Sequence, residues 1–491
     1  MEGYWLLTPE ILLLVGAMIT PGMYFLTNKN TQLSTYLATV FLTLSFFSLW
    51  LTWTPPSITG LTAHEVLSYS FFEGYELDTF SQLFKALFLL ISIATALLSF
   101  TYIKDDEHQV EYFTLLITAT LGMMVVASSS NFILLFIGIE LTAFSSYALV
   151  AFRKRDDLST EAGAKYVLIG AFSSAMTLYG ISLIYAISGN LDFEAIDGIL
   201  DSGRGAEFST HIFISILFIV AGIGFKISAV PFHSWAPDVY QGAPTPVTMF
   251  LAAGSKAVGF VALFKIFLVA LPSVSVEWEI MMGILAIATM TLGNVVAITQ
   301  NDVGRMLAYS SIAQAGYILM ALPAMTEPAV AGAIAHTIVH AVMKGGAFVI
   351  VAAVGMRGLG YSVDSFKGLH KLSPTMAFSM TICLLALVGM PPVAGFFTKF
   401  FLFYYVYQAS TVKSWLLILV IVGILNSAIS LYYYLRIIRN MYLFDPEDSE
   451  ISFPDSVKFL AVVTMLILVI VVPAFWNDFF QICEYAASRI L

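Results

Sequence analysis

The chain has 491 residues, of which 59% are hydrophobic and 11% are charged, and its mean hydropathy is +0.87. Soluble domains carry about 25% charged residues, so this composition excludes an ordinary soluble domain and indicates an integral membrane protein. The net charge of −10 gives no reason to expect a nucleic-acid partner. The two cysteines, Cys383 and Cys483, suggest neither a disulfide framework nor a metal-ligand spacing, so we expect no metal and no cofactor in this chain.

About 14 apolar runs reach the roughly 20 residues that a helix needs to cross the hydrocarbon layer. The runs are too long and too uniformly apolar for membrane strands, so an all-α membrane protein is predicted. They lie near residues 5–27, 33–54, 80–102, 112–129, 131–152, 162–187, 211–235, 246–271, 277–299, 303–324, 327–356, 373–406, 412–440 and 456–476.

Basic residues are concentrated in alternate predicted loops, and loops rich in Lys and Arg face the cytoplasm. The loops after odd-numbered helices carry Lys29, Lys104, Arg153, Lys154, Arg155, Arg357, Lys367, Lys371, Arg436 and Arg439. The loops after even-numbered helices have few basic residues beyond Arg204 and Lys413 and carry acids instead, namely Glu65, Glu73, Glu76, Asp78, Asp192, Glu194, Asp197 and Asp201. Both termini are therefore predicted to lie outside the cell.

Two of the predicted helices contain prolines at membrane depth. The seventh carries Pro231, and the twelfth carries Pro391 and Pro392. Proline removes a backbone donor and clashes with the preceding turn, and irregular backbone within a membrane survives only where it is buried in protein or lines a wet cavity. Interruptions in corresponding places suggest inverted repeats. The predicted divisions are 1–111 for three N-terminal helices, 112–271 and 277–440 for the repeats, and 441–491 for a C-terminal loop and last helix.

Five charges lie inside these apolar runs: Glu140, Lys226, Lys256, Lys344 and Lys399. Each costs about 2.5–3.5 kcal/mol at the centre of a membrane helix on insertion scales, and the five together cost on the order of 10 kcal/mol. Such groups have to be paired, hydrated or able to exchange protons. The structural alternatives are interhelical ion pairs and, for the lysines, side chains that extend to the membrane surface. A proton path through the membrane is the leading hypothesis.

His336, His340 and Lys344 follow one another at four-residue spacing, so they share one face of a helix. Protons can pass between such groups through water, which favours a relay. Polar contacts between helices and metal binding by the two histidines are the alternatives, and no third metal ligand is evident. His233 and Asp238 flank the first break, where proton transfer and simple loop stabilisation explain them equally well.

Four further charges lie near the ends of predicted spans. Lys265 is expected to extend to the membrane surface. Lys165, Asp302 and Arg305 lie near inner helix ends, where contacts with loops or partner subunits are expected.

Lysine suits a site that must release protons near neutral pH. Desolvation lowers the pKa of buried lysines to about 5–6 in documented cases, and a nearby carboxylate opposes that effect. Moving one charge against a potential of about 100 mV needs about 2.3 kcal/mol, and one pKa unit supplies about 1.36 kcal/mol. Movement or discharge of Glu140 is therefore predicted to switch Lys226 between holding and donating a proton.

The stretch FKISAVPFHSWAPDVYQGAPTPVTMFLAAGSKAVGF resembles the core of the antiporter-like subunits of respiratory complex I. The segments EAGAKYVLIGAFSSAMTLYGISLIY, RMLAYSSIAQAGYILM and GMPPVAGFFTKF resemble subunit N most closely, and the likeness runs from about residue 75 to 440. By motif, Glu140 matches the glutamate of the family's fifth helix. Lys226, Lys256 and Lys399 match the lysines of its seventh, eighth and twelfth helices. A glutamate in place of Lys399 would have resembled subunit M, and no lateral arm of the subunit L kind is evident.

The face formed by His336, His340 and Lys344 is typical of subunits L and M and is often altered in bacterial subunit N. The chain therefore resembles subunit N from a lineage away from the common bacterial one.

The resemblance implies a fold of about 14 membrane helices with inverted five-helix repeats and broken helices seven and twelve. It implies proton translocation in a prokaryotic cell membrane, driven by electron transfer in other subunits. The implied electron donor is NADH, reduced coenzyme F420 or ferredoxin, and the acceptor is a membrane quinone or phenazine. Iron–sulfur clusters, flavin and the quinone or phenazine are expected in a peripheral redox arm and in membrane subunits similar to L, M, K, J, A and H.

Three other interpretations stay open. A subunit of a multi-subunit Na⁺/H⁺ antiporter would transport sodium without a redox partner. A membrane-bound hydrogenase or formate-lyase arm would have a nickel–iron partner. A passive scaffold would keep its lysines for structural reasons alone.

Overall fold

A computed structural model describes residues 4–27, 31–53, 69–72, 74–104, 106–358, 360–446 and 453–491. Three residues of the predicted loops, Lys29, Glu65 and Glu73, lie outside this part of the chain. The elements in the first half are η1 (Tyr4–Leu7), α1 (Thr8–Leu26), α2 (Thr31–Thr52), β1 (Tyr69–Phe72), β2 (Tyr75–Leu77), α4 (Thr79–Tyr102), α5 (Gln109–Ser128), α6 (Phe132–Val150), α7 (Asp157–Ser188), α8 (Phe193–Ile199), η2 (Leu200–Arg204), α9 (Gly205–Glu207), α10 (Ser209–Ile227), α11 (Trp235–Gly242), α12 (Thr245–Phe250), η3 (Leu251–Ser255), α13 (Lys256–Phe264), η4 (Lys265–Ala270) and η5 (Pro272–Glu277). The second half comprises α14 (Glu279–Thr299), α15 (Val303–Leu319), α16 (Ala321–Ala324), α17 (Glu327–Gly355), η6 (Val363–Phe366), α18 (Leu369–Leu372), α19 (Pro374–Val388), α20 (Ala394–Ala409), α21 (Leu416–Leu443), α22 (Asp455–Leu466), η7 (Ile467–Val471), α23 (Val472–Ala474) and α24 (Trp476–Ala487).

The chain folds as a bundle of membrane-length helices, as the composition predicts. Within the described residues, 13 helices are long and apolar enough to cross a membrane. Each of them falls on one of the predicted apolar runs, and the remaining run, 373–406, falls on the two shorter helices α19 and α20. The fold class is confirmed, whereas the exact number of spans and the repeat boundaries stay predictions.

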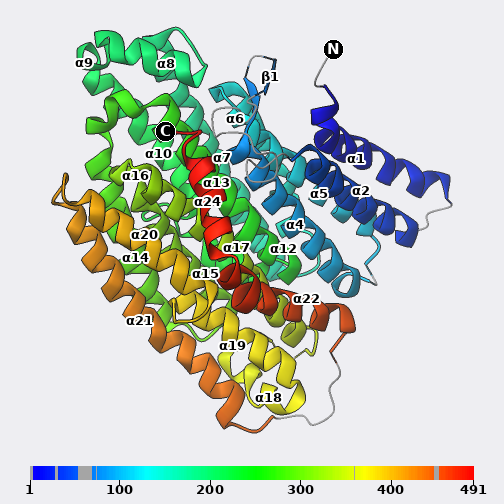
Figure 1. The fold of residues 1–491 in the computed structure, drawn as a ribbon. Helices are drawn as coiled ribbons and strands as arrows, with labels where there is room; N and C mark the ends of the chain where they lie inside the picture. Colours follow the sequence, from blue (N-terminus) through cyan, green and yellow to red (C-terminus); the bar gives the residue numbers. More distant parts are fainter. Residues whose placement is uncertain are drawn as a thin grey trace.

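The most buried helices lie at the centre of the bundle. The continuous helix from Thr245 to Ala270 is buried along its length, and α15 and α17 are buried almost as completely. The N-terminal helices α1 and α2 pack beside α4 and α5 on one flank, while α14 and α21 lie on the other (Figure 1). The side chains of the five predicted membrane charges therefore come from elements at or next to the protein interior rather than from the lipid-facing rim.

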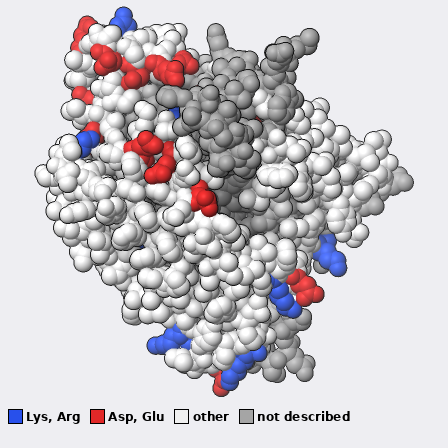
Figure 2. All heavy atoms as spheres, in the orientation of Figure 1, with Lys and Arg blue, Asp and Glu red and all other residues white. Residues whose placement is uncertain are grey.

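The two ends of the bundle carry opposite charge (Figure 2). Acidic side chains gather at the end that carries α8 and α9, and basic ones gather near α18 and the start of α22. We call these the acidic end and the basic end; exposed members include Glu194, Asp201 and Glu207 at the first and Lys371 and Arg439 at the second.

Both predicted helix breaks are present, and they share a backbone geometry. The first lies beyond α10, whose C-cap residue Ser228 has a φ of 59°, and a cis peptide bond joins Val230 to Pro231. The second lies beyond α19, whose C-cap residue Gly389 has a φ of 90°, and a cis peptide bond joins Pro391 to Pro392. The seventh span was expected to continue to residue 235, but the helix ends at Ile227 because Pro231 cannot continue it.

Three local features were not expected from the sequence. The helix that carries Lys256 contains the π-helical turns η3 and η4, which no apolar pattern signals. A short antiparallel hairpin, β1–β2, precedes α4. The last helix, α24, follows the predicted final span and packs against α17.

Candidate functional site

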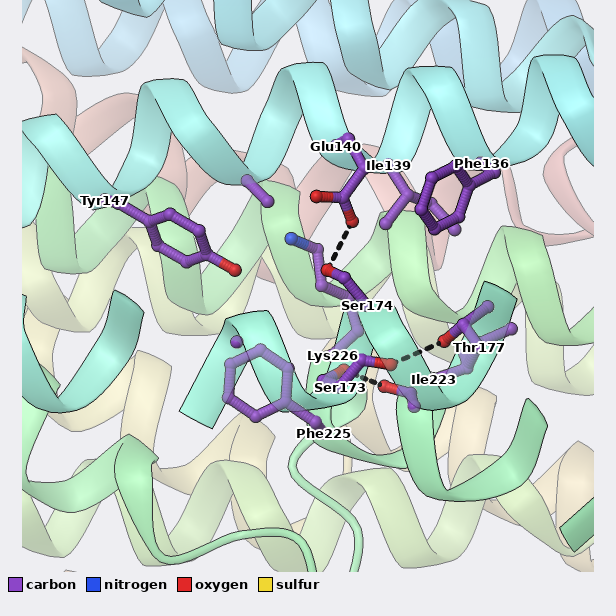
Figure 3. A pocket seen from close by; sticks show the side chains of 13 residues that line it. Phe136, Ile139, Glu140, Tyr147, Ser173, Ser174, Thr177, Ile223, Phe225 and Lys226 are labelled. Carbon is purple, nitrogen blue, oxygen red and sulfur yellow. Dashed lines mark hydrogen bonds between the residues drawn. The ribbon is translucent and has the colours of Figure 1, made fainter. Parts of the chain in front are cut away.

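Glu140 and Lys226 line one small cavity, which is shown in Figure 3. Glu140 lies on α6 and is half-buried, and its Oε1 accepts a hydrogen bond of 2.5 Å from Ser174 Oγ on α7. Lys226 lies in the last turn of α10 and is 5% exposed. Both side chains are directed into the same space, which holds about 20 Å³ of free volume, enough for one water molecule.

No direct ion pair closes this cavity. Within the described part of the chain, Lys226 Nζ has no hydrogen-bond partner, and no carboxylate oxygen lies within 4.0 Å of it. A buried ammonium without partners is costly, and the free volume of the cavity is large enough for one water molecule beside Nζ.

The cavity walls are set by the close packing of α7 on α10. Ser173 Oγ donates a hydrogen bond of 2.6 Å to the carbonyl oxygen of Gly222. A Cβ atom at Gly222 would lie 1.8 Å from Thr177 Oγ1, so only glycine allows this contact. The contact holds Lys226, one turn further along α10, opposite Glu140.

Lys256 lies beside this site on the buried helix α13. It directly follows the π-helical turn η3, is 2% exposed, and has no hydrogen-bond partner for Nζ among the described residues. A Cβ atom at Gly259 would lie 2.5 Å from Ile227 Cγ2, which shows that α13 packs tightly on the end of α10. Lys256 therefore lies about one helical turn from the point where the two helices touch. π-Helical turns often occur at functional sites.

The uninterrupted helix α17 carries the next polar groups. Lys344 Nζ donates to Leu307 O at 2.9 Å and to Ser310 Oγ at 2.5 Å, both on α15. The rings of His336 and His340 are 6.4 Å apart between centroids, and both are buried. His340 Nε2 has no hydrogen-bond partner in the described residues. The predicted shared face is thus present, and it points into the protein.

The nitrogens of His336 are both engaged in hydrogen bonds. Nδ1 lies 2.9 Å from Thr398 Oγ1 on α20, and Nε2 lies 3.0 Å from Gln314 Oε1 on α15. Neither nitrogen is free to bind a metal. Among the described residues, no group of three or more His, Cys, Asp or Glu side chains is arranged to hold a metal ion.

Lys399 lies on α20, just past the second break. Its Nζ donates to Leu387 O at 2.8 Å, to Val388 O at 3.1 Å and to Ser427 Oγ at 3.2 Å. It also lies 4.5 Å from the centroid of the Tyr317 ring. The two carbonyls belong to the last turn of α19, where unpaired carbonyls and the helix dipole favour a positive charge. The break therefore supplies the lysine with polar partners; Pro391 and Pro392 themselves are exposed.

Three of the lysines and the two histidines of α17 form one electrostatically connected set. The charges of Lys256 and Lys399 both act on Lys344, and all three act on His340. None of the ion pairs in the described residues includes Lys226, Lys256, Lys344 or Lys399. Because like charges in a poorly solvated interior repel strongly, a proton added to one member affects the others.

His233 and Asp238 lie at the first break, beyond the end of α10. His233 is half-buried beside the exposed Pro231. Asp238 Oδ2 accepts from Lys165 Nζ at 2.7 Å and Asp238 Oδ1 from Arg305 Nη1 at 2.6 Å, which joins α11 to the basic-end termini of α7 and α15. Burial acts to raise the pKa of the Asp238 carboxyl, but the two cations outweigh burial and hold that pKa below its ordinary value. Asp238 thus links three elements through its ion pairs, and its part in proton transfer stays a prediction.

Two further expectations about charges are resolved by these contacts. Lys165 and Arg305 both contact Asp238 on α11, and Asp302 Oδ1 caps α15 by accepting from Arg305 N at 2.8 Å. Lys265 does not extend to the membrane surface. It is 4% exposed, and Nζ donates to Ser129 O at 2.8 Å, because the chain around β2 and Ser129 covers this end of the helix.

One buried ion pair was missed. Lys85 on α4 is fully buried, and its Nζ lies 2.8 Å from Glu10 Oε1 on α1 and 2.9 Å from Tyr75 Oη. Glu10 and Lys85 each lie near the start of an apolar run. From the sequence alone, an exposed side chain is the simpler prediction at such a position than a buried ion pair. The apolar run that contains Lys85 is the signal that could have identified it.

Comparisons with known proteins place this arrangement in a family. Residues 129–429 match the family model described as NADH:quinone oxidoreductase/Mrp antiporter, TM. The chain is 38% identical to F420H2 dehydrogenase subunit N of Methanosarcina mazei, covering 100% of this chain and 99% of the relative. It is 39% identical to NADH-quinone oxidoreductase subunit N of Desulforamulus reducens, covering 85% and 86% of the two chains.

Solved structures share the fold. A chain of respiratory complex I from Thermus thermophilus with bound aureothin matches 96% of this chain, with a TM-score of 0.79 and 26% identity, and 98% of that chain is covered. A chain of the archaeal membrane-bound sulfane sulfur reductase has a TM-score of 0.87 and 25% identity, covering 99% and 97% of the two chains. A chain of the Mrp complex from Dietzia matches with a TM-score of 0.85 at 17% identity, covering 100% and 98%, and supports the fold alone. The chain belongs to the NADH:quinone oxidoreductase/Mrp antiporter membrane family, and its relatives include N subunits of complex I-type oxidoreductases.

Proposed function

We propose that this chain is the proton-translocating N subunit of a complex I-type oxidoreductase, and that Glu140, Lys226, Lys256, Lys344 and Lys399, with His336 and His340, carry the protons. The observation that supports this most strongly is the pairing of Glu140 with Lys226 across a cavity the size of one water. A structural ion pair would be in direct contact, whereas a pair that trades protons needs room for the carrier.

The mechanism follows from the contacts at each lysine. When Glu140 is charged, it stabilises an ammonium at Lys226 across the cavity. Loss of that stabilisation favours release of the Lys226 proton, and Lys256, on the helix α13 that packs against the end of α10, is the proposed acceptor. The charge of Lys256 interacts with His340 and Lys344, and these residues interact with Lys399. The proton is proposed to pass in this order, from Lys256 to Lys399. Each transfer moves a proton between nitrogen atoms through water, and no electron transfer takes place in this chain.

Electron transfer is proposed to occur in partner subunits. The donor is NADH, reduced coenzyme F420 or ferredoxin, and the acceptor is a membrane quinone or phenazine. Relatives named for F420H2 and for NADH support this class of donor without choosing between its members. We place iron–sulfur clusters, flavin and the quinone or phenazine in a peripheral arm and in membrane subunits similar to L, M, K, J, A and H.

The proposed orientation puts the basic end in the cytoplasm of a prokaryotic cell and both termini outside, because Lys and Arg favour the cytoplasmic side. The start of α1 and the end of α24 lie toward the acidic end in Figure 1, in keeping with this orientation. Each break follows a helix that ends in a left-handed C-cap residue, Ser228 or Gly389, and this correspondence supports the proposed repeats, 112–271 and 277–440.

The test uses the intact complex, purified from its native membrane and reconstituted in liposomes. Replacing Lys226 with Met removes the charge but keeps an unbranched side chain of similar length. Proton transport coupled to donor oxidation is expected to fall by roughly 10²-fold or more, the range for loss of a proton-transfer group. Lys458→Met, at a surface lysine paired with Asp455, is the matched control.

Unchanged proton transport in assembled Lys226→Met complex would refute the proposal and favour a passive scaffold. Sodium transport that persists with no redox subunits in the preparation would instead identify an Na⁺/H⁺ antiporter. A nickel–iron partner would identify a hydrogenase-type complex. We favour protons because the lysine-rich set offers ammonium groups, which cannot ligate Na⁺, whereas hard cations are bound by oxygen ligands.

A further inference from the structure

A pocket with a free volume of about 270 Å³ lies between α4, α17 and α22, and η3 also contributes to its wall. α22 packs against both α4 and α17, and α17 contacts α4 (Figure 1). Among the described residues that line the pocket, Thr464 alone has a polar side chain, and its Oγ1 donates to Leu460 O at 2.8 Å. The pocket therefore offers water no free polar partner, and apolar cavities of this kind stay dry.

Two neighbouring glycines of α17 explain why the pocket exists. At Gly346 an added Cβ would lie 2.3 Å from Thr464 Cγ2, so glycine lets α22 approach α17 closely. At Gly345 an added Cβ would meet nothing within 4 Å, although this residue is buried. Protein interiors are close-packed, and the walls of an unfilled space lose van der Waals contacts. We therefore expect a hydrophobic molecule to fill the space beside Gly345.

The pocket has the length of one membrane leaflet. Its lining on α4 runs from Leu87 to Leu97, which is about 15 Å of helix. The hydrocarbon layer of a bilayer is about 30 Å thick, so the pocket spans half of it. Leu90 and Phe459 line the pocket and are exposed, so it is open to the surrounding lipid. A hydrocarbon chain fits this lining, whereas a quinone ring would need polar partners that the lining lacks.

The basic end supplies positive charge just beyond the pocket. Thr101 Oγ1 and Ser456 Oγ lie 3.2 Å apart, about one turn beyond the lining residues of α4 and α22. Lys104 follows α4 and is exposed. Arg357 follows α17, and its guanidinium lies 5.7 Å from the centroid of the Phe453 ring, which precedes α22. Cations at this level attract the phosphate groups of membrane lipids.

We propose that this pocket binds one hydrocarbon chain of a phospholipid from the leaflet at the basic end, with the lipid phosphate near Lys104 and Arg357. The bound chain packs on η3, which directly precedes Lys256, and on the turn of α17 that carries Lys344. It therefore keeps water away from that side of both helices. The proposal does not depend on proton translocation by this chain, because it rests on the shape and lining of the pocket.

The test is Gly345→Phe in the intact complex purified from its native membrane, with mass spectrometry of the phospholipids that stay bound after detergent washing. The phenyl ring would occupy the pocket, so the variant is expected to retain one phospholipid fewer for each copy of this chain. Gly22→Phe is the matched control, because an added Cβ at this exposed position of α1 also meets nothing within 4 Å but lies outside the pocket. Lys104→Gln is expected to weaken binding of the same lipid about fivefold. Lys371→Gln, at a basic-end lysine paired with Asp445, should leave it unchanged.

Equal phospholipid retention by the Gly345→Phe and native complexes would overturn the proposal. A map of the native complex in which a partner subunit's polypeptide fills the pocket would overturn it as well. If Gly345→Phe did not assemble, the smaller change Gly345→Leu and that map would decide. Continuous chain-like density between α4, α17 and α22 supports the proposal, and an empty pocket overturns it. Unchanged retention by Lys104→Gln would overturn the placement of the phosphate.

Discussion

Replacing Gly222 with Ala tests whether the contact between α7 and α10 fixes the geometry of the proton-transfer pair. The added Cβ would lie 1.8 Å from Thr177 Oγ1, against 3.4 Å for an ordinary contact, so the two helices must separate by about 1.6 Å or the threonine must rotate. The added Cβ would also lie 2.7 Å from the carbonyl oxygen of Ser173, so rotation of Thr177 alone cannot relieve the strain. Overpacking of this kind costs about 1–3 kcal/mol.

The functional effect is expected to exceed the effect on stability. A misplacement of about 1 Å in reacting groups can lower a rate by about 10²-fold, and Lys226 lies one turn beyond Gly222 on the same helix. We therefore expect proton transport to fall by roughly 10–10²-fold while the complex still assembles. Proton transport per electron pair in liposomes measures the first quantity, and thermal unfolding of the purified complex measures the second.

The matched control is Gly22→Ala in the membrane helix α1, where an added Cβ meets nothing within 4 Å. Thr177→Ala combined with Gly222→Ala should recover part of the lost transport, since it removes the nearest clash but leaves the backbone contact. Normal transport by the assembled Gly222→Ala complex would show that tight packing of α7 on α10 does not position Lys226, and the reasoning would be wrong.

Two further predictions concern ion pairs away from the proton-transfer set. The pairing of Asp238 with Lys165 and Arg305 lowers the pKa of the carboxyl below the ordinary 3.8, so it stabilises the fold above that pH and loses this effect as pH falls through the lowered value. Asp238→Asn should therefore lower the unfolding temperature at pH 7, with a difference from the native protein that narrows steadily below pH 3.8; a constant difference would contradict the assignment. Lys85→Met should lower the free energy of unfolding by about 3–5 kcal/mol, because it breaks the link between α4 and α1 and leaves Glu10 buried without its partner. Adding Glu10→Gln should restore most of that loss, and a double variant as unstable as Lys85→Met would show that the charge imbalance is not the cause.

Much of the fold was predictable because the membrane imposes a simple rule. Long apolar runs must form helices, and prolines within them must break those helices unless protein or water compensates. Both breaks and the inward direction of Lys226 and Lys399 followed from that rule. The π-helical turn before Lys256 did not, because it depends on how the finished bundle packs rather than on any residue pattern.

Charged groups near helix ends were harder to predict than those at mid-span. Lys265 and Lys85 each have two plausible environments, the membrane surface and a buried partner, and their positions in the sequence do not separate the two. In the fold, Ser129 O and Glu10 provide the partners, and both come from segments distant in the chain.

The buried helix that carries Lys256 has a consequence for biosynthesis. This helix, from Thr245 to Ala270, packs against α17, which begins only at Glu327. At a synthesis rate of about 5–20 residues per second, the ribosome needs several seconds to make the intervening chain. During that time a helix bearing two lysines lacks one of its main neighbours, and a charge facing lipid is expensive. The lysines of the helix Thr245–Ala270 are therefore fully buried only after α17 has been inserted. Chains truncated after residue 324 should be retained poorly in the membrane, even though they contain every span of the first half.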